Sequence, residues 1–267
     1  MRHDEYRALP GVNWSTLSAM RTSPLHYRHR LEQPREDTPG MRFGRALHCA
    51  VLEPDDFPLE WTVYDGRRAG TAWTEFATVN AAKGILTVED YERVLDARDA
   101  VLAHKAARRL LRHGRTEVTL RWVDQATKLR CKGRLDHLRG GSLTDLKSTQ
   151  DIEARTFGRL GTKYGYIEQL AFYRRGLAAN GITPGPTQIV AVEALPPHDV
   201  AVFEFDEETL WAGDENVGEL LAKVKQYHRW RCPPGRYPEP LRFEVSPWYY
   251  TELEDATSIG VSFGGTP

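Results

Sequence analysis

Three residues around one expected hairpin could form a catalytic centre. The stretch GRLDHLRGGSLTDLKST, residues 133–149, contains Asp136, Asp145 and Lys147. Asp145 and Lys147 are two positions apart on an expected strand, so their side chains project from the same face. Asp136 ends the preceding strand, so the two carboxylates and the ammonium should converge near one end of the sheet. Two carboxylates this close need a cation to stay ionised, and their hard oxygen ligands suit Mg²⁺ or Mn²⁺.

The same three residues also have a simpler interpretation. The pattern D-x-K is short and common, and Asp145 and Lys147 could form a surface salt bridge with Asp136 as a turn residue. The metal interpretation therefore depends on what else the chain brings to this point.

The elements that must position these residues follow from periodicity. Alternation predicts strands over 116–123, 128–138 and 141–147, with RGG as the tight turn before the third. Further along the chain we expect a helix over 164–180, strands over 187–195 and 200–206, and a closing helix over 207–230. Before the strands we expect helices over 11–31 and 37–53, the first of them broken near Ser23-Pro24. A strand over 57–64 and a loop over 65–88 should follow. One long helix is expected over 87–113, with Thr87 and Asp90 placed as a capping box.

This order predicts an α/β fold with a mixed sheet. The 267 residues show no strong linker, so we expect one domain over 1–267: a helical part over about 1–115, a core over about 116–232 and a tail over 233–267. No apolar run is long enough to cross a membrane and no signal peptide is evident, which indicates a cytoplasmic protein. The net charge of −1 gives no indication that the protein binds nucleic acid. The basic runs over 20–31 and 104–115 are either phosphate-facing patches or solvated helix faces.

Several motifs carry a resemblance to a known family. GRLD followed by TDLKST resembles the PD-(D/E)xK nuclease superfamily in its RecB-like branch, GRALH supplies Gly44 and His48, and QLAFY supplies Gln169 and Tyr173. Within that branch, the order and spacing of the motifs over about residues 11–195 most resemble RecE-type phage recombination exonucleases (exonuclease VIII-like). The resemblance implies a restriction-endonuclease-like core with a central mixed sheet flanked by helices, and an N-terminal helical region.

The resemblance also implies roles for residues. Mg²⁺, with Mn²⁺ as a substitute, would be held by His48, Asp136, Asp145 and the carbonyl of Leu146. Lys147 would position the attacking water or offset charge. Gln169 and Tyr173 would orient the lysine or contact the DNA backbone.

Some assignments remain open. Taken alone, His48 could be a core histidine, and Gln169 and Tyr173 could be ordinary, partly buried polar residues. Glu117 could bind a second metal or simply hold a basic residue. The candidates for DNA contact are Arg67, Arg68, Arg130, Lys132 and Arg134, of which the last three alternate on one strand face and form either a basic wall or a solvated face. The three scattered cysteines cannot form an iron–sulfur cluster, a disulfide framework or a CxxC metal pair.

The function implied by the resemblance is a magnesium-dependent exodeoxyribonuclease. It would degrade linear duplex DNA 5′ to 3′ and leave 3′ single strands for recombination. We expect a single-strand annealing protein as partner, a homo-oligomer that could be a ring, and no membrane. Two alternatives stay open: a RecB-like repair or adaptation nuclease with endonuclease or single-strand activity, and a non-catalytic DNA-binding module, against which the intact set of site residues argues.

Overall fold

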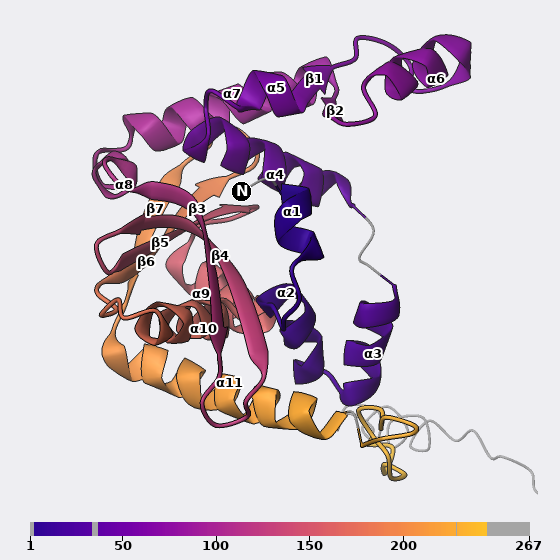
Figure 1. Ribbon diagram of the computed structural model, residues 1–267. Coiled ribbons are helices and arrows are strands. Elements are labelled where there is room, and N and C mark those ends of the chain that lie inside the picture. The colour runs from indigo at the N-terminus through magenta and orange to yellow at the C-terminus, as the bar shows by residue number, and fades with distance from the viewer. Residues whose placement is uncertain (1–2, 34–36, 228, 245–267) are drawn as a thin grey trace, which may run out of the picture.

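The computed structural model describes residues 3–33, 37–227 and 229–244, and it shows a sheet with helices on both faces (Figure 1). The helices are α1 (His3–Ala8), α2 (Trp14–Leu17), the 3-10 helix η1 (Ser18–Arg21), α3 (Pro24–Glu32), α4 (Pro39–Leu52), α5 (Phe57–Glu60), α6 (Gly70–Val79), α7 (Val88–Ala103), α8 (Lys105–Leu111), α9 (Ala154–Tyr164), α10 (Tyr166–Ala179) and α11 (Glu207–Tyr227). The strands are β1 (Trp61–Val63), β2 (Gly84–Leu86), β3 (Arg115–Val123), β4 (Arg130–Arg139), β5 (Ser142–Thr149), β6 (Thr187–Glu193) and β7 (Val200–Phe205). Most of the predicted tail over 233–267 lies outside the described residues.

The main sheet is mixed, as predicted, with the strand order β3-β4-β5-β6-β7. β5 and β6 run parallel, and the other neighbouring strands run antiparallel. The tight turn between β4 and β5 contains Gly140, whose φ of 60° is a conformation that glycine adopts without strain. Because parallel strands need a long connection, α9 and α10 form the crossover from β5 to β6. The fold class predicted from the sequence is therefore confirmed.

Each face of the sheet packs against its own hydrophobic core. One core, against α10 and α11, contains Leu143, Phe172 and Leu221. The other, against α4 and α7, contains Leu47 and Leu146. Figure 1 shows α10 and α11 on one side of the sheet and α4 and α7 on the other. β5 is therefore covered on both faces, and its side chains must be apolar or paired.

Strands β4 and β5 separate after a short paired stretch. Pairing is limited to residues 137–139 of β4 and 142–144 of β5. Beyond it, the backbone N–H of Leu146 donates to Asp136 Oδ2 at 2.8 Å. The prediction that Asp136 ends its strand is therefore wrong: Asp136 lies inside β4, and its carboxylate occupies the gap between the strands.

Two predicted elements after α4 differ from the structure. Residues 57–64 form α5 and then β1, and residues 65–88, predicted as a loop, contain α6 and β2. α6 buries none of its side chains, although Trp73, Phe76 and Val79 recur at helical spacing in its sequence. It is covered instead by Tyr64, whose ring centroid lies 5.1 Å from that of Trp73 and 4.8 Å from that of Phe76.

The long helix predicted from Thr87 breaks at His104. Thr87 caps α7, since its Oγ1 accepts the N–H of Asp90 at 3.0 Å. His104 has a ψ of 116°, outside the helical region, and its Nδ1 accepts the N–H of Ala107 at the start of α8. Histidine is not among the preferred N-cap residues, so periodicity alone gave no sign of the break.

The longest described helix, α11, has 21 residues and packs along α10. None of the helices in the described ranges combines the length and apolarity needed to cross a membrane.

Candidate active site

A cleft of about 1200 Å³ lies where β4 and β5 separate. The N-terminal residues, α4, the strands β3 to β5 and α10 all contribute to its walls. The predicted site residues that line it are His48, Glu117, Asp136, Lys147, Gln169 and Tyr173. The fold therefore brings residues from several separate elements into one cavity. His48 lies in its wall rather than in a core.

Three side chains in the cleft form a group that can hold a metal ion. His48 from α4, Glu117 from β3 and Asp136 from β4 each offer one ligand atom, and these atoms lie within 4.8 Å of one another. His48 Nδ1 is 3.5 Å from Asp136 Oδ2. Two carboxylates suit Mg²⁺ or Mn²⁺, and neutral imidazole is the commonest metal ligand among the titratable side chains. The donor set fits a divalent cation.

Glu117 reaches this group through an unusual backbone conformation. Its φ is 50°, in the left-handed region that residues with a Cβ seldom adopt. It lies opposite Asp136, at a point where the ladder between β3 and β4 is interrupted. Strain of about 1–3 kcal/mol persists only where the surroundings impose it, and such strain clusters at functional sites. The backbone thus supports Glu117 as a site residue independently of the sequence resemblance.

The facing carboxylates of Glu117 and Asp136 would be stabilised by additional positive charge. Burial and the neighbouring Asp136 raise the pKa of Glu117 to about 7. Arg134 opposes this shift, and its Nε forms an ion pair with Glu117 Oε2. Glu117 does hold a basic residue, which is one of its two predicted roles. A divalent cation between Glu117 and Asp136 would stabilise both ionised carboxylates.

Asp145 and Lys147 form a second group beside the first. Asp145 is 1% exposed, and its Oδ2 lies 2.5 Å from Lys147 Nζ. The Gln169 amide donates to Asp145 Oδ1 at 3.3 Å and to the Tyr173 phenol oxygen at 3.2 Å. The predicted convergence of the two aspartates and the lysine is confirmed. Asp145 engages Lys147, however, and is not among the three ligand residues that lie within 4.8 Å of one another.

Lys147 is an ammonium group in this arrangement. Burial alone would lower its pKa, but Asp145 and Asp136 hold the pKa above its usual value. Burial in turn raises the pKa of Asp145 to about 6, against the effect of Lys147. The ring centroid of Tyr166 lies 5.3 Å from the ammonium. A protonated Lys147 can donate hydrogen bonds to a phosphate oxygen or a water, but it cannot accept a proton.

Two glycines let the helices approach the strands closely. A Cβ at Gly44 of α4 would lie 3.2 Å from Ser148 Oγ on β5, and a Cβ at Gly133 of β4 would lie 3.0 Å from the ring of Tyr173. Gly44 stands one helical turn before His48, on the same face of α4. The G-x-x-x-H spacing in the sequence therefore has a steric reason.

Comparisons with known proteins identify the family and the fold of the chain. A family model described as "PDDEXK-like domain of unknown function (DUF3799)" matches residues 13–237. The chain belongs to this family. The solved structure of a candidate exonuclease from Eubacterium rectale resembles it with a TM-score of 0.67 and 14% sequence identity, over 94% of this chain and 98% of that chain. The solved structure of a phage-related exonuclease from Haemophilus somnus 129PT gives a TM-score of 0.36 at 14% identity, over 82% of this chain and 93% of that chain. A TM-score this low does not establish a shared fold.

No curated protein sequence matches the chain. At 14% identity, the Eubacterium rectale structure shows a shared fold and nothing more. The family match confirms the superfamily predicted from the hairpin. Its range contains every predicted site residue, whereas Tyr6, which also lines the cleft, lies before it.

The basic residues predicted on β4 occupy different environments in the PDDEXK-like domain. The prediction that Lys132 belongs to a DNA-facing wall is wrong, because its side chain is 2% exposed and its ammonium donates to three backbone carbonyls. Arg134 lines the cleft beside Glu117, and Arg130 is exposed. These three residues do not form one continuous basic wall.

The two arginines predicted before α6 also differ from each other. Arg68 donates to the carbonyl of Ile85 at 2.9 Å, and its guanidinium lies 5.4 Å from the ring centroid of Trp73. Arg67 is exposed. Neither arginine is among the cleft-lining residues, whereas Lys83 from the same region is.

A basic row that we did not predict lies on α9. Arg155, Arg159 and Lys163 recur every four residues and are exposed, and α9 contains no acidic residue. Arg21 of η1 donates to the carbonyls of Thr162 and Lys163, which joins the end of this row to the elements around the cleft. The i,i+4 spacing was the signal in the sequence.

Two tyrosines were also missed. Tyr166 lies three positions before Gln169, on the same face of α10, so helical spacing could have revealed it. Tyr6 lies on the six-residue helix α1, where no pattern marks it. Burial raises the pKa of its phenol to about 12, with Arg134 opposing the shift and Glu117 adding to it.

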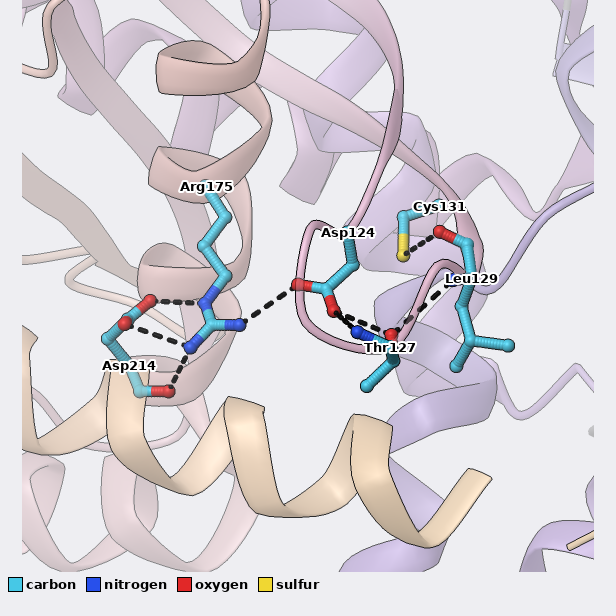
Figure 2. A network of polar contacts seen from close by, with 6 residues as sticks. All are labelled: Asp124, Thr127, Leu129, Cys131, Arg175 and Asp214. Carbon is cyan, nitrogen blue, oxygen red and sulfur yellow. Dashed lines mark hydrogen bonds and ion pairs between the residues drawn. The ribbon is translucent and has the colours of Figure 1, made fainter. Parts of the chain in front are cut away.

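A separate ion network fixes α10 (Figure 2). Arg175 pairs with Asp214 of α11 and, at 3.2 Å, with Asp124 in the turn between β3 and β4. Asp124 also accepts the N–H and hydroxyl of Thr127, at 2.8 and 2.6 Å. Burial alone would raise the pKa of Asp124, but the hydrogen bonds from Thr127 and the charge of Arg175 lower it. The network ties α10, which carries three of the residues around Lys147, to its neighbours.

Proposed function

We propose that the chain is a metal-dependent deoxyribonuclease that removes nucleotides from the ends of linear duplex DNA. The observation that carries the proposal is the convergence of two groups in one cleft of a PDDEXK-like fold. The first is the metal-binding group of His48, Glu117 and Asp136, and the second is the pair of Asp145 and Lys147.

Mg²⁺ is the metal that we propose, with Mn²⁺ as a substitute. His48, Glu117 and Asp136 would hold it, and Asp145 and the carbonyl of Leu146 are further candidate ligands. When bound, such a cation lowers the pKa of a coordinated water and polarises a phosphoryl oxygen. The raised pKa of Glu117 supports the fit, because a carboxylate that is short of positive charge gains most from a cation.

The remaining residues act on the phosphate and on one another. The Lys147 ammonium would donate to a non-bridging phosphate oxygen or orient the attacking water. Gln169 holds Asp145 in place, and Tyr173 accepts the second hydrogen bond of the Gln169 amide. Tyr166 lies beside the ammonium and limits its positions.

The shape of the cleft supports an end as the substrate. The N-terminal residues and α4 contribute walls to the cleft that contains the metal-binding group, and we propose that a single strand enters this cleft more easily than an unbroken duplex does. Bending an intact duplex into it would cost several kcal/mol, on the order of 1–6. We therefore propose exonuclease action. The resemblance of the motifs to RecE-type exonucleases supports the finer proposals, which are digestion 5′ to 3′ and 3′ tails left for recombination with a single-strand annealing protein. We also propose a cytoplasmic location.

We also propose that copies of the chain form a homo-oligomer, for which we propose a ring-shaped arrangement. α6 projects from the body (Figure 1) and buries none of its ten residues, and Val79 at its end is 84% exposed. An exposed helix of this kind is the contact that we expect between copies. Light scattering on the full chain, with Val79→Asp as the variant, tests this point.

The test of the nuclease proposal is digestion of end-labelled linear duplex and of covalently closed circles by the full chain. We expect short products from linear DNA, little cutting of circles, and no cutting in EDTA. Asp136→Asn should abolish digestion, and Asp124→Asn is the matched control because it changes an aspartate outside the cleft. Full activity in EDTA would overturn the metal proposal. Rapid linearisation of closed circles would replace the exonuclease with an endonuclease.

A further inference from the structure

One wall of the cleft comes from the N-terminal segment, defined here as residues 6–15. The residues of this segment that line the cleft are Tyr6, Arg7, Asn13, Trp14 and Ser15. The family match begins at residue 13, so it does not cover α1 or the turn after it. The role of this part has to come from its contacts with the rest of the chain.

A buried lysine anchors the segment. Lys132 on β4 is 2% exposed, and its Nζ donates to the carbonyls of Tyr6 at 2.9 Å, Arg7 at 3.0 Å and Leu9 at 2.6 Å. An ammonium has three donors, and here all three are used. Burying an ammonium is costly unless it is fully hydrogen-bonded, so this geometry strongly favours one position of α1 relative to β4. The same Nζ lies 4.9 Å from the ring centroid of Tyr6.

The backbone reinforces the anchor. Because β4 leaves β5 early, Val12 pairs with the exposed edge of β4: its N–H donates to Arg130 O at 2.9 Å, and its carbonyl accepts the Lys132 N–H at 2.8 Å. Gly11 precedes it with a φ of 138°, and a Cβ there would lie 3.3 Å from Arg130 O. The segment therefore fits against β4 through two independent sets of contacts.

This anchor places the phenol of Tyr6 at the catalytic cleft. Tyr6 lines the cleft together with Arg134 and Glu117, and both charges act on its phenol. Within the described part of the chain, its oxygen makes no hydrogen bond. The Tyr6 phenol is therefore an O–H donor near the Arg134 guanidinium. In the same cleft, Glu117 and Asp136 are placed so that they could bind a cation together.

We propose that Tyr6 is a substrate-binding residue that donates a hydrogen bond to a phosphate oxygen of the DNA strand in the cleft, and that Lys132 is the positioning residue that holds Tyr6 there. The proposal rests on the proposed nuclease function. Phosphate is the ligand class that this geometry selects, because a phenol and a guanidinium together offer donors and positive charge to an anion. Glu117 and Asp136 repel an anion from the metal position unless a cation is present there.

The first test is Tyr6→Phe, which keeps the ring and removes the hydroxyl. We expect KM for linear duplex to rise about tenfold, with kcat, the melting temperature and Mn²⁺ affinity unchanged. In the inactive Asp136→Asn background, the dissociation constant for the same DNA should rise by the same factor. Tyr27→Phe is the matched control, because Tyr27 is a buried tyrosine that packs on Tyr227 in a core.

The second test is Lys132→Met, which keeps the length of the side chain and removes its three donors. It should lower the melting temperature and raise KM as Tyr6→Phe does, and the double variant should raise KM no further than Lys132→Met alone. Lys128→Met, an exposed lysine before the same strand, should change neither quantity. If Lys132→Met fails to fold, the comparison of Tyr6→Phe with Tyr27→Phe still decides whether the phenol binds DNA.

The outcomes separate the two proposals. Cleavage by the wild type together with an unchanged KM in Tyr6→Phe would overturn this inference alone. Independent, multiplicative effects of the two variants would show that Lys132 does not act through Tyr6. A wild-type chain that neither cleaved nor bound DNA would remove the proposed function and this inference together.

Discussion

Two clusters of carboxylates meet α10, and their charges are balanced in opposite ways. In the cluster drawn in Figure 2, Asp124 accepts two hydrogen bonds from Thr127 and forms an ion pair with Arg175. The pKa of Asp124 is lowered as a result. At the cleft, burial raises the pKa of Glu117 to about 7 and that of Asp145 to about 6. The first cluster offsets the burial of its carboxylate from within the chain, whereas Arg134 and Lys147 offset burial only in part at the second.

This difference separates a structural network from a binding site. Carboxylates that serve stability are surrounded by donors, because an uncompensated buried charge costs several kcal/mol. In the cleft, Glu117 pairs with Arg134 and Asp145 with Lys147, yet burial keeps the pKa of both carboxyl groups raised. Their ionised forms are therefore less well stabilised than that of Asp124, and they gain more from a bound cation. Glu117 also keeps a strained backbone to join this group. These features lower the stability of the fold at the cleft, and contacts elsewhere in the chain compensate for the loss, as is common for functional sites.

The largest expected effect is on activity, from removing the cation of the cleft cluster. Lys147→Met should lower the rate of DNA cleavage by about 100- to 1000-fold, because an electrostatic donor to the phosphate is lost. DNA binding should change by less than about tenfold, since Lys147 is one contact among several. Initial rates and binding isotherms on the same duplex measure both quantities. Near-normal cleavage by Lys147→Met would place the chemistry elsewhere in the cleft.

Removing the cation of the other cluster should affect stability instead. Arg175→Met leaves Asp124 and Asp214 without their shared partner, which should cost about 2–4 kcal/mol, or roughly 5–15 °C in melting temperature. Activity measured well below the transition should stay within about twofold of the wild type. A large loss of activity in the folded variant would show that this network also sets the position of α10 at the site.

The two clusters also differ in how well the sequence predicted them. The hairpin of Asp136, Asp145 and Lys147 was found because period two and a tight turn place residues locally. The network around Arg175 was not found, because it joins a turn and two helices that no local rule brings together. Lys132 was misassigned for the same reason: strand parity gives the face of a side chain, but not whether another segment covers it.

The rest of the fold shows the same limit. Strands of the main sheet and helices with a buried stripe were predicted. α6 was missed because DGRRAGT at the head of its region is typical of a loop, although Trp73, Phe76 and Val79 recur at helical spacing. The break at His104 was missed because its cap is not a favoured residue type. Tyr6 enters the cleft only through the anchor on β4, which involves partners more than 120 residues away in sequence. Such long-range contacts carry no periodic signal.

The pH dependence of stability should have opposite signs in the two clusters. Because the pKa of Asp124 is lowered by folding, its contribution should be present above about pH 4, the ordinary value for aspartate, and lost as the pH falls below it. Because the pKa of Glu117 is raised to about 7, its contribution should be present below about pH 4 and lost as the pH rises to 7. Denaturant unfolding in EDTA between pH 3 and 8 measures both.

The matched variants for this test are Asp124→Asn and Glu117→Gln. Relative to the wild type, Asp124→Asn should be less stable at pH 7, with the difference shrinking below pH 4. Glu117→Gln should gain stability over the wild type as the pH rises from about 4 to 7, by on the order of 2–3 kcal/mol, and added Mn²⁺ should reduce that gain. Equal slopes for the two variants would contradict the contrast between the clusters.

The smallest expected effect concerns cations that the chain leaves for DNA. Arg155, Arg159 and Lys163 lie on one exposed face of α9, and steps of four residues at 1.5 Å place successive charges about 6 Å apart along the helix. A duplex strand presents a phosphate every 3.4 Å along its axis, so this row can follow several phosphates of DNA leaving the cleft. Changing each to Gln should weaken binding by a few-fold, independently of sequence. It should also reduce the slope of log affinity against log salt concentration by about 0.9 per phosphate contact. Arg108 and Arg109 on α8 are the matched pair, because α8 packs on α7 and β7 whereas α9 packs on α10, and their replacement by Gln should leave the slope unchanged. Equal changes for α8 and α9 would assign both rows to general charge attraction rather than to a path for the strand.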